Sequence, residues 1–145
     1  MLFRSIASIF QETKIDPTII NGGVINSINN SAKLGKSDWS ILEADESDGS
    51  FVFIPPTYSI ITNIDREHMD YYGTMDKLNK YFENFVNKVP PFGKSFICLD
   101  DKNNKNLIKN NKNRKTRGHV RTRARSKNMV LIKFKIGRAS CRERV

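Results

Sequence analysis

Strand-like and helical patterns alternate along the first hundred residues, and this alternation constrains the fold more than any other feature. Four short apolar runs have strand character: "PTIING", "DWSILEA", "YSIITNI" and "SFICL". Nearly continuous apolar runs are typical of strands that are buried on both faces of a parallel sheet. A helical pattern separates the last two runs, and strand–helix–strand order indicates a right-handed crossover unit. The sequence therefore predicts an α/β fold over residues 15–100, with a partial, mostly parallel sheet and flanking helices.

The clearest predicted helix covers residues 75–89, where Thr74 is a suitable N-cap and Pro90 and Pro91 follow the last turn. A second helix is predicted at the start of the chain. Its apolar residues recur at helical spacing: Leu2, Ile6, Ile9 and Phe10. This segment lacks the continuous apolar stretch of a signal peptide, and no run of about 18 apolar residues occurs in the chain. We therefore expect no membrane span and a cytoplasmic protein.

The net charge of +10 is unevenly distributed. Residues 1–100 hold 9 Lys/Arg against 13 Asp/Glu, whereas residues 101–135 hold 13 Lys/Arg against Asp101 alone. We expect residues 102–128 to be largely irregular because they offer little apolar surface to offset chain entropy. The later run "VLIKFKI" has the composition of one more strand.

Basic segments such as residues 102–135 can bind nucleic acid by neutralising phosphates. No aromatic residue is interleaved in "NRKTRGHVRTRARSKN" for base stacking. A small basic nucleic-acid-binding protein acting through residues 102–135 is therefore the alternative function, and nucleic acid is the less favoured partner.

The last ten residues, Ile136 to Val145, match one reading frame of a widely used sequencing-library adapter. A tail of this kind is excluded from reasoning about the fold, and Cys141 is excluded with it. Cys98 then remains alone in an apolar run, where a buried hydrophobic role is typical. The chain therefore has no disulfide framework and no CxxC metal site.

Two polar clusters follow two of the predicted strands. "SILEADESD" holds Glu43, Asp45, Glu46 and Asp48, and "IITNIDREHMD" holds Asn63, Asp65, Glu67, His68 and Asp70. Any one of these acids alone would be interpreted as a solvated loop residue, and a lone histidine is more often structural. Ligands of α/β sheets bind beyond the carboxyl ends of the strands, however, and two acidic clusters there would repel each other. Mg²⁺, which prefers carboxylate oxygens, is the cation that best offsets this repulsion.

The motifs "NGG" after "DPTII", then "EADESDGSF", then "TNIDREHMDYYG" resemble the central ATPase domain of the Mur ligases. The resemblance runs from about Ser5 to about Asp101 and is strongest to the members that join L-alanine to UDP-N-acetylmuramate in peptidoglycan synthesis. It implies an ATP- and Mg²⁺-dependent ligase. In the implied reaction the γ-phosphoryl of ATP passes to the lactyl carboxylate, and the amine of alanine then displaces phosphate from the acyl phosphate.

The resemblance also implies roles for individual residues. Glu43 corresponds to a Mg²⁺-binding glutamate, and His68 to a histidine that helps to hold a second metal near the transferred phosphoryl group. Both are candidate catalytic residues, and we expect them to lie near each other at the carboxyl edge of the sheet. Asn63 is a candidate for cofactor binding. The candidates for contacts with the muramyl substrate are Asn21, Gly22, Asp45, Glu46 and Ser47.

Some parts of the family pattern have no counterpart in these 145 residues. The GxxGKT phosphate-binding loop is expected just before the first helix, and two flanking domains are expected on either side. Glu67 stands where many relatives have Asp. We therefore expect residues 1–101 to be part of a central ATP-binding domain. The basic segment 102–135, which is either poorly ordered or a remnant of that domain, and the adapter-like tail 136–145 follow it. Such a piece of a longer gene should not turn over alone, and a folded, catalytically inactive binding domain remains a third possibility.

Overall fold

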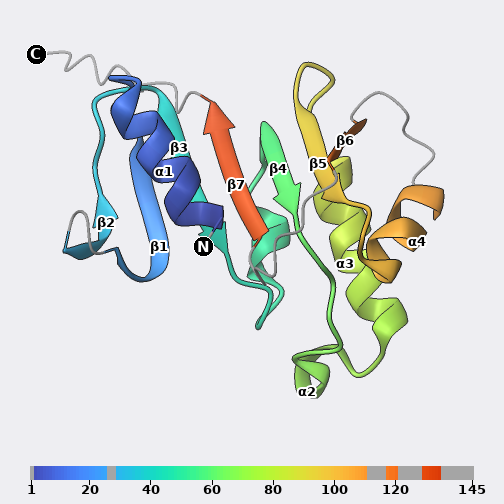
Figure 1. Cartoon of the computed structure of the whole chain (residues 1–145). Helices are drawn as coiled ribbons and strands as arrows, with labels where there is room; N and C mark the ends of the chain where they lie inside the picture. Colours follow the sequence, from blue (N-terminus) through green and yellow to red (C-terminus); the bar gives the residue numbers. More distant parts are fainter. Residues whose placement is uncertain (1, 26–28, 111–116, 121–128, 135–145) are drawn as a thin grey trace, which may run out of the picture.

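The computed structural model describes residues 2–25, 29–110, 117–120 and 129–134, which form one seven-stranded sheet with helices packed on it (Figure 1). The strands are β1 (Thr18–Ile25), β2 (Asn30–Lys33), β3 (Trp39–Ala44), β4 (Tyr58–Ile61), β5 (Lys94–Cys98), β6 (Arg117–Val120) and β7 (Met129–Phe134). The helices are α1 (Leu2–Glu12), the 3₁₀-helix η1 (Ser50–Phe53), α2 (Met69–Tyr72), α3 (Met75–Asn87) and α4 (Lys102–Asn110).

The strand order is β2-β1-β3-β7-β4-β5-β6. Strand β1 pairs in parallel with β3, and β5 pairs in parallel with both β4 and β6. Strand β7 lies between β3 and β4 and is antiparallel to both, with Trp39 opposite Phe134 and Tyr58 opposite Ile132. Strands β3 and β4 therefore point the same way, downward in Figure 1, and their carboxyl ends lie at one edge of the sheet. The predicted α/β fold and the predicted strand in "VLIKFKI" are confirmed.

Helices cover both faces of the sheet. Helix α1 buries Phe3 and Ala7 against Ile19 of β1 and Ile41 of β3. The next residues along β3 point to the other face, because side chains alternate along a strand. There Leu42 and Ala44 join the core built by α3. The sheet thus forms the middle of three layers, as expected for an α/β fold.

The larger core surrounds Phe51, which is 1% exposed. Its ring centroid lies 5.1 Å from that of Phe82 and 5.4 Å from that of Phe85, both on α3. Because Phe51 lies three residues after Asp48, this packing anchors the downstream end of the acidic loop that follows β3.

The structure corrects the prediction that residues 102–128 are largely irregular, since Lys102–Asn110 form α4 and Arg117–Val120 form β6. Helix α4 buries Asn104 and Leu107, which are 0% and 2% exposed, against the end of the sheet. Asp101 Oδ1 accepts a hydrogen bond of 2.7 Å from the Asn104 backbone N–H and so caps the first turn. One buried face and one cap are enough to form this helix, although its other face is basic. Residues 111–116 and 121–128 and the tail 136–145 lie outside the described residues.

Two further predictions differ in detail from the structure. Strand β1 extends three residues beyond the predicted run "PTIING", to Ile25, because β2 pairs with it there after a shift of register between Ile20 and Ile25. In α1, Ile9, which belongs to the apolar pattern that predicted this helix, is 60% exposed, whereas Phe3 and Ala7 are buried. The helix is therefore rotated relative to the face that its spacing suggested.

Removing the N-cap of α3 should lower the stability of the protein measurably. Thr74 Oγ1 accepts a hydrogen bond of 3.2 Å from the Lys77 backbone N–H, as predicted from the sequence. Thr74→Ala should lower the free energy of unfolding by about 1 kcal/mol, measured by urea denaturation. The exposed substitution Lys80→Ala on the same helix is the control. An equal effect of the two substitutions would show that the cap contributes nothing specific.

Candidate functional site

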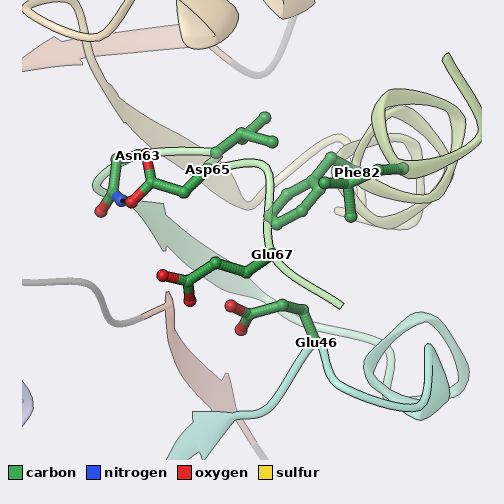
Figure 2. A pocket seen from close by; sticks show the side chains of 7 residues that line it. Glu46, Asn63, Asp65, Glu67 and Phe82 are labelled. Carbon is green, nitrogen blue, oxygen red and sulfur yellow. Dashed lines mark hydrogen bonds between the residues drawn. The ribbon is translucent and has the colours of Figure 1, made fainter. Parts of the chain in front are cut away.

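Two loops meet at the carboxyl edge of the sheet. One follows β3 and holds Glu46, and the other follows β4 and holds Glu67 and His68. Each of these three side chains offers one ligand atom, and the three atoms lie within 4.8 Å of one another. Figure 2 shows the side chains of Glu46 and Glu67 extending side by side from the two loops, with their carboxylates near each other. The parallel arrangement of β3 and β4 thus brings together acids from distant parts of the sequence.

A small cavity adjoins this cluster, with a volume of about 10 Å³. Its lining residues are Glu46, Asn63, Ile64, Asp65, Glu67, Leu78 and Phe82. A cavity of this size has space for about one water molecule or one metal ion. Within the described residues, the cavity therefore fits an ion and leaves no space for a nucleotide inside it.

The electrostatics of the cluster favour a cation. Burial raises the pKa of Glu46, and the neighbouring carboxylates of Asp45 and Glu67 raise it further, whereas the Glu46 backbone hydrogen bond and His68 act in the opposite direction. Glu46 therefore takes up a proton more readily than a free glutamate, and a bound cation would stabilise its anionic form. Two carboxylates suit Mg²⁺, and the additional imidazole is a ligand that Mn²⁺ also accepts.

Backbone hydrogen bonds hold the first loop in shape. Asp45 Oδ1 accepts from the Ser47 N–H at 2.8 Å, and Asp48 Oδ1 accepts from the Ser50 N–H at 2.8 Å. Hydrogen bonds from Ser50 keep the pKa of Asp48 below its ordinary value. These are local turn interactions typical of aspartate. Asp45 and Asp48 therefore shape the loop that presents Glu46.

Tyr72 holds the same loop from α2. Its hydroxyl donates to the Glu46 backbone carbonyl. Burial raises the pKa of Tyr72, and the nearby charge of Glu46 raises it further, so that the hydroxyl keeps its proton at neutral pH. The ring packs edge-on against Tyr71 and Tyr81 at 4.8 and 5.2 Å between centroids. The three packed tyrosine rings thus hold the Tyr72 hydroxyl in place, and the hydroxyl fixes the position of the Glu46 backbone.

The second loop has its own internal contacts. Asn63 Nδ2 donates to Asp65 Oδ2 at 2.7 Å, and Thr62 Oγ1 donates to Asn63 Oδ1 at 2.9 Å. His68 has left-handed backbone angles, with φ 55° and ψ 37°, directly before α2. A residue other than glycine adopts this conformation at a cost of about 1 kcal/mol or more, and such residues cluster at functional sites. The first turn of α2 supports it, because the His68 carbonyl accepts from the Tyr71 and Tyr72 N–H groups.

The residues predicted from the sequence divide into two groups in space. Glu43, at the end of β3, accepts a hydrogen bond of 3.3 Å from the Gly22 N–H through Oε2. Asn21 lies beside it on β1 and donates to the Gly23 carbonyl at 2.7 Å. The three-residue cluster instead contains His68 with Glu46 and Glu67, and Glu43 is not a member of it. The joint role of Glu43 and His68 stays a prediction.

Sequence reasoning assigned Glu46 to substrate contacts and gave Glu67 no role as a ligand, so it missed this grouping. The available signal was that Glu46 and Glu67 follow two strands, β3 and β4, that run in the same direction. The fold then determines which of the several acids meet.

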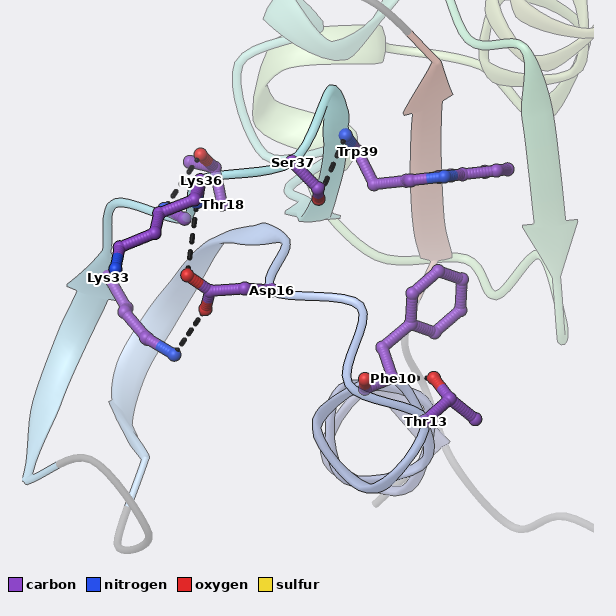
Figure 3. Close-up of polar contacts among 9 residues, drawn as sticks. Phe10, Thr13, Asp16, Thr18, Lys33, Lys36, Ser37 and Trp39 are labelled. Atoms are coloured by element: carbon purple, nitrogen blue, oxygen red, sulfur yellow. Dashed lines mark hydrogen bonds and ion pairs between the residues drawn. The ribbon is translucent and has the colours of Figure 1, made fainter.

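A wider, open hollow lies at the opposite edge of the sheet, where β1 and β3 begin. Its lining residues are Lys14, Ile15, Asp16, Lys36, Ser37, Asp38 and Trp39. Asp16 accepts from Lys33 Nζ at 2.7 Å and from the Lys36 N–H at 3.1 Å, as Figure 3 shows. The hydrogen bond from Lys33 keeps the pKa of Asp16 below its ordinary value. This network ties the β2–β3 connection to β1, and the amino edge of such a sheet is not where ligands usually bind.

Comparisons with known proteins agree with this architecture. The profile of the Mur ligase middle domain matches residues 7–143, which is most of the chain. The chain belongs to the Mur ligase family. It is 74% identical over 103 residues to the UDP-N-acetylmuramate–L-alanine ligase of Pelagibacter ubique (strain HTCC1062), covering 71% of this chain and 22% of that protein. It is 48% identical over 95 residues to the protein of the same name from Paramagnetospirillum magneticum, covering 66% of this chain and 20% of that protein. This Mur ligase chain thus spans about a fifth of the length of these relatives.

Solved Mur ligase structures share the fold. The UDP-N-acetylmuramate–alanine ligase of Thermotoga maritima superposes with a TM-score of 0.65 at 23% identity, over 72% of this chain and 24% of that one. The UDP-N-acetylmuramate:L-alanyl-gamma-D-glutamyl-meso-diaminopimelate ligase from Neisseria meningitides gives 0.67 at 20% identity, over 74% of this chain and 38% of that one. None of the comparisons favours the nucleic-acid-binding alternative. In the part of the chain that the structure describes, every helix is too short or too polar to cross a bilayer.

Proposed function

We propose that this chain is part of a cytoplasmic, ATP-dependent ligase that joins L-alanine to UDP-N-acetylmuramate through an acyl phosphate. The 74% identity to a relative that bears this name is the observation that carries the proposal. The acidic motifs at the carboxyl edge of the sheet support it, because they lie where α/β proteins bind their ligands. The chain itself supplies one wall of the active site in this proposal.

The described residues fit a divalent cation. Glu46, Glu67 and His68 would hold it, since their ligand atoms already lie within 4.8 Å of one another next to an ion-sized cavity. Glu43 is the proposed ligand of a second Mg²⁺, at the end of β3. When bound, Mg²⁺ neutralises phosphate charge during phosphoryl transfer.

The remaining candidates would position ATP and the nucleotide-sugar substrate. Asn63, which follows β4, is proposed to contact the cofactor, and the loop of Asp45 and Ser47 is proposed to contact the muramyl group. Asn21 and Gly22 adjoin Glu43 and would bind at the β1 side of the same edge. In Figure 1 helix α1 runs antiparallel to β3, so its amino-terminal end lies at this edge as well. A phosphate-binding loop placed before α1 would therefore face the same acids.

Exchange of the matching segment in a relative would test the proposed function. The aligned 103 residues of the Pelagibacter ubique protein would be replaced by those of this chain. We expect the hybrid to release ADP from ATP only when both UDP-N-acetylmuramate and L-alanine are present, and the 145-residue chain alone to release none. A folded hybrid that is inactive with L-alanine but active with another amino acid would contradict the proposed substrate.

Glu46→Gln should stabilise the metal-free protein at neutral pH. Burial raises the pKa of Glu46 above its ordinary value of 4.5, so the folded chain binds this proton more tightly than the unfolded chain. The contribution of Glu46 to stability is therefore greatest at low pH and falls as the pH rises from 4.5 through the raised pKa. We expect Glu46→Gln to raise Tm at pH 7 by on the order of 2 °C without divalent cations, and to change it little at pH 4.

Glu12→Gln, on the exposed end of α1, is the matched control and should not change Tm. In the same thermal scans, added Mn²⁺ should raise the Tm of the unsubstituted protein more than it raises the Tm of Glu46→Gln. A lower Tm for Glu46→Gln at pH 7 without metal would contradict the electrostatic interpretation of the cluster.

A further inference from the structure

The first turn of α4 contacts the loop that carries half of the candidate site. Asn103 Nδ2 donates to the Ile64 carbonyl at 2.7 Å. Asn104 Nδ2 donates to the carbonyls of Thr62 and Cys98, each at 3.0 Å. The contacts to Ile64 and Thr62 span 39 and 42 residues of sequence, and the contact to Cys98 spans 6. Together they join α4 to the ends of both β4 and β5. They come from the segment whose composition suggested an irregular basic tail.

The carbonyls that accept these hydrogen bonds lie at or shortly after the ends of β4 and β5. Strand β4 ends at Ile61 and β5 ends at Cys98, so their ladder of backbone hydrogen bonds stops where the loop begins. Buried backbone carbonyls are almost always paired. The two asparagine amides donate to the carbonyls of Thr62, Ile64 and Cys98 and so tie the start of the loop to α4. The loop can therefore leave the sheet along one defined path toward Asn63, Asp65, Glu67 and His68.

The side chain of Asn104 is fully buried although one of its polar atoms is unpaired within the described part of the chain, an arrangement that does not favour stability. Its side chain is 0% exposed, and its Oδ1 atom has no hydrogen-bond partner among the described residues. A buried unpaired acceptor lowers stability. The amide is nevertheless oriented so that its NH₂ group reaches both strand ends, and Asp101 fixes the backbone of the same residue through the helix cap. In this orientation Nδ2 donates to the carbonyls at both strand ends, while Oδ1 stays without a partner among the described residues.

We propose that Asn103 and Asn104 are positioning residues for the candidate site: they hold residues 62–68 in the path that brings Glu67 and His68 to Glu46. Neither asparagine touches the cluster itself, and both act through the backbone of the loop. Their connection to metal binding rests on the proposed function, whereas their effect on the loop does not. The structure thus assigns α4 to the active-site framework and not to a separate basic module.

The test compares variants of the 145-residue protein by hydrogen–deuterium exchange of the peptide that covers residues 62–68, without metal. Asn103→Ala should speed exchange in this peptide by about tenfold, as expected for the loss of one hydrogen bond that closes a loop. Asn103→Asp keeps the shape but removes the donor, so it should exchange at least as fast as Asn103→Ala. Asn106→Ala, an exposed asparagine on the same helix, is the matched control and should exchange as the unsubstituted protein does.

Mn²⁺ titration of the same variants then tests the positioning role. Asn103→Ala should bind Mn²⁺ about tenfold more weakly, the scale observed when a group that orients a metal ligand is removed. If Asn104→Ala folds, it should show faster exchange at residues 62–68 and weaker Mn²⁺ binding than Asn103→Ala. If Asn104→Ala does not fold, Asn103→Ala alone tests the positioning role. Unchanged exchange at residues 62–68 in Asn103→Ala would overturn the inference. Faster exchange with unchanged Mn²⁺ affinity would overturn the positioning role and leave a structural one.

The two proposals can fail separately. If the unsubstituted protein binds no Mn²⁺, the metal assignment under the proposed function is wrong, and the exchange measurements still decide whether α4 holds the loop.

Discussion

Glu43→Gln and His68→Ala should each lower the rate of the hybrid ligase by about a hundredfold or more. That factor is typical of removing one strong electrostatic contact from a phosphoryl-transfer or acyl-transfer site. Glu43→Gln keeps the size and the hydrogen-bonding shape of the side chain and removes its charge. His68→Ala removes the imidazole that lies within 4.8 Å of two carboxylates. The measurement is ADP release dependent on L-alanine, at saturating ATP and over a range of Mg²⁺ concentrations.

The Mg²⁺ dependence separates loss of metal binding from loss of chemistry. If a variant binds the metal more weakly, part of its rate should return at higher Mg²⁺ concentration. Glu12→Gln, far from the carboxyl edge, should retain the rate of the unsubstituted hybrid. A normal rate for Glu43→Gln would refute its role as a ligand and leave the cluster of Glu46, Glu67 and His68 as the metal site.

Phe51→Ala should be the most destabilising single substitution that we predict for the core, with a loss of about 3–5 kcal/mol in the free energy of unfolding. Phe51 is 1% exposed and contacts Phe82 and Phe85 on α3. Its removal leaves a cavity between η1 and α3 that the rigid sheet cannot close. Urea denaturation followed by circular dichroism would measure this loss, which is a large part of the stability of a typical domain.

Phe53, two residues away in the same 3₁₀-helix, offers a matched control. Its ring is 78% exposed, with Lys88 Nζ at 5.6 Å from the centroid. Phe53→Ala should therefore lower stability by less than about 1 kcal/mol. If both phenylalanines gave the same small loss, the packing of η1 against α3 would be wrong.

The strands and helices that sequence patterns predicted correctly are those with strong local signals. The apolar runs became β1, β3, β4 and β5, and the helix after Thr74 became α3 with its predicted cap. Parallel strands then made it possible to predict that the acids after β3 and β4 share one edge. The polar strand β2 had no such signal, because "NSAK" forms a strand only by pairing with β1.

The details of the site depended on contacts that a linear pattern does not contain. Tyr72 and the turns of Asp45 and Asp48 set the path of the first loop, so that Glu46 meets His68. Asn103 and Asn104 act on the second loop from a helix that begins about 35 residues later. The sequence analysis did not predict these two hydrogen-bond donors, because it interpreted their segment from its high positive charge. Long-range hydrogen bonds of this kind decide which of several acids form a cluster.

The place of β7 has a consequence for the order in which the protein is made. Strands β3 and β4 do not pair with each other, and both pair with β7, which is the last of the described strands along the chain. On the ribosome, the edges of β3 and β4 stay without this partner until residues 129–134 emerge. Contacts between residues so distant in sequence form slowly, and open strand edges recruit other chains. Closure of the sheet centre is therefore the step at which a nascent chain is most exposed to aggregation, and the step at which a chaperone that covers strand edges would act.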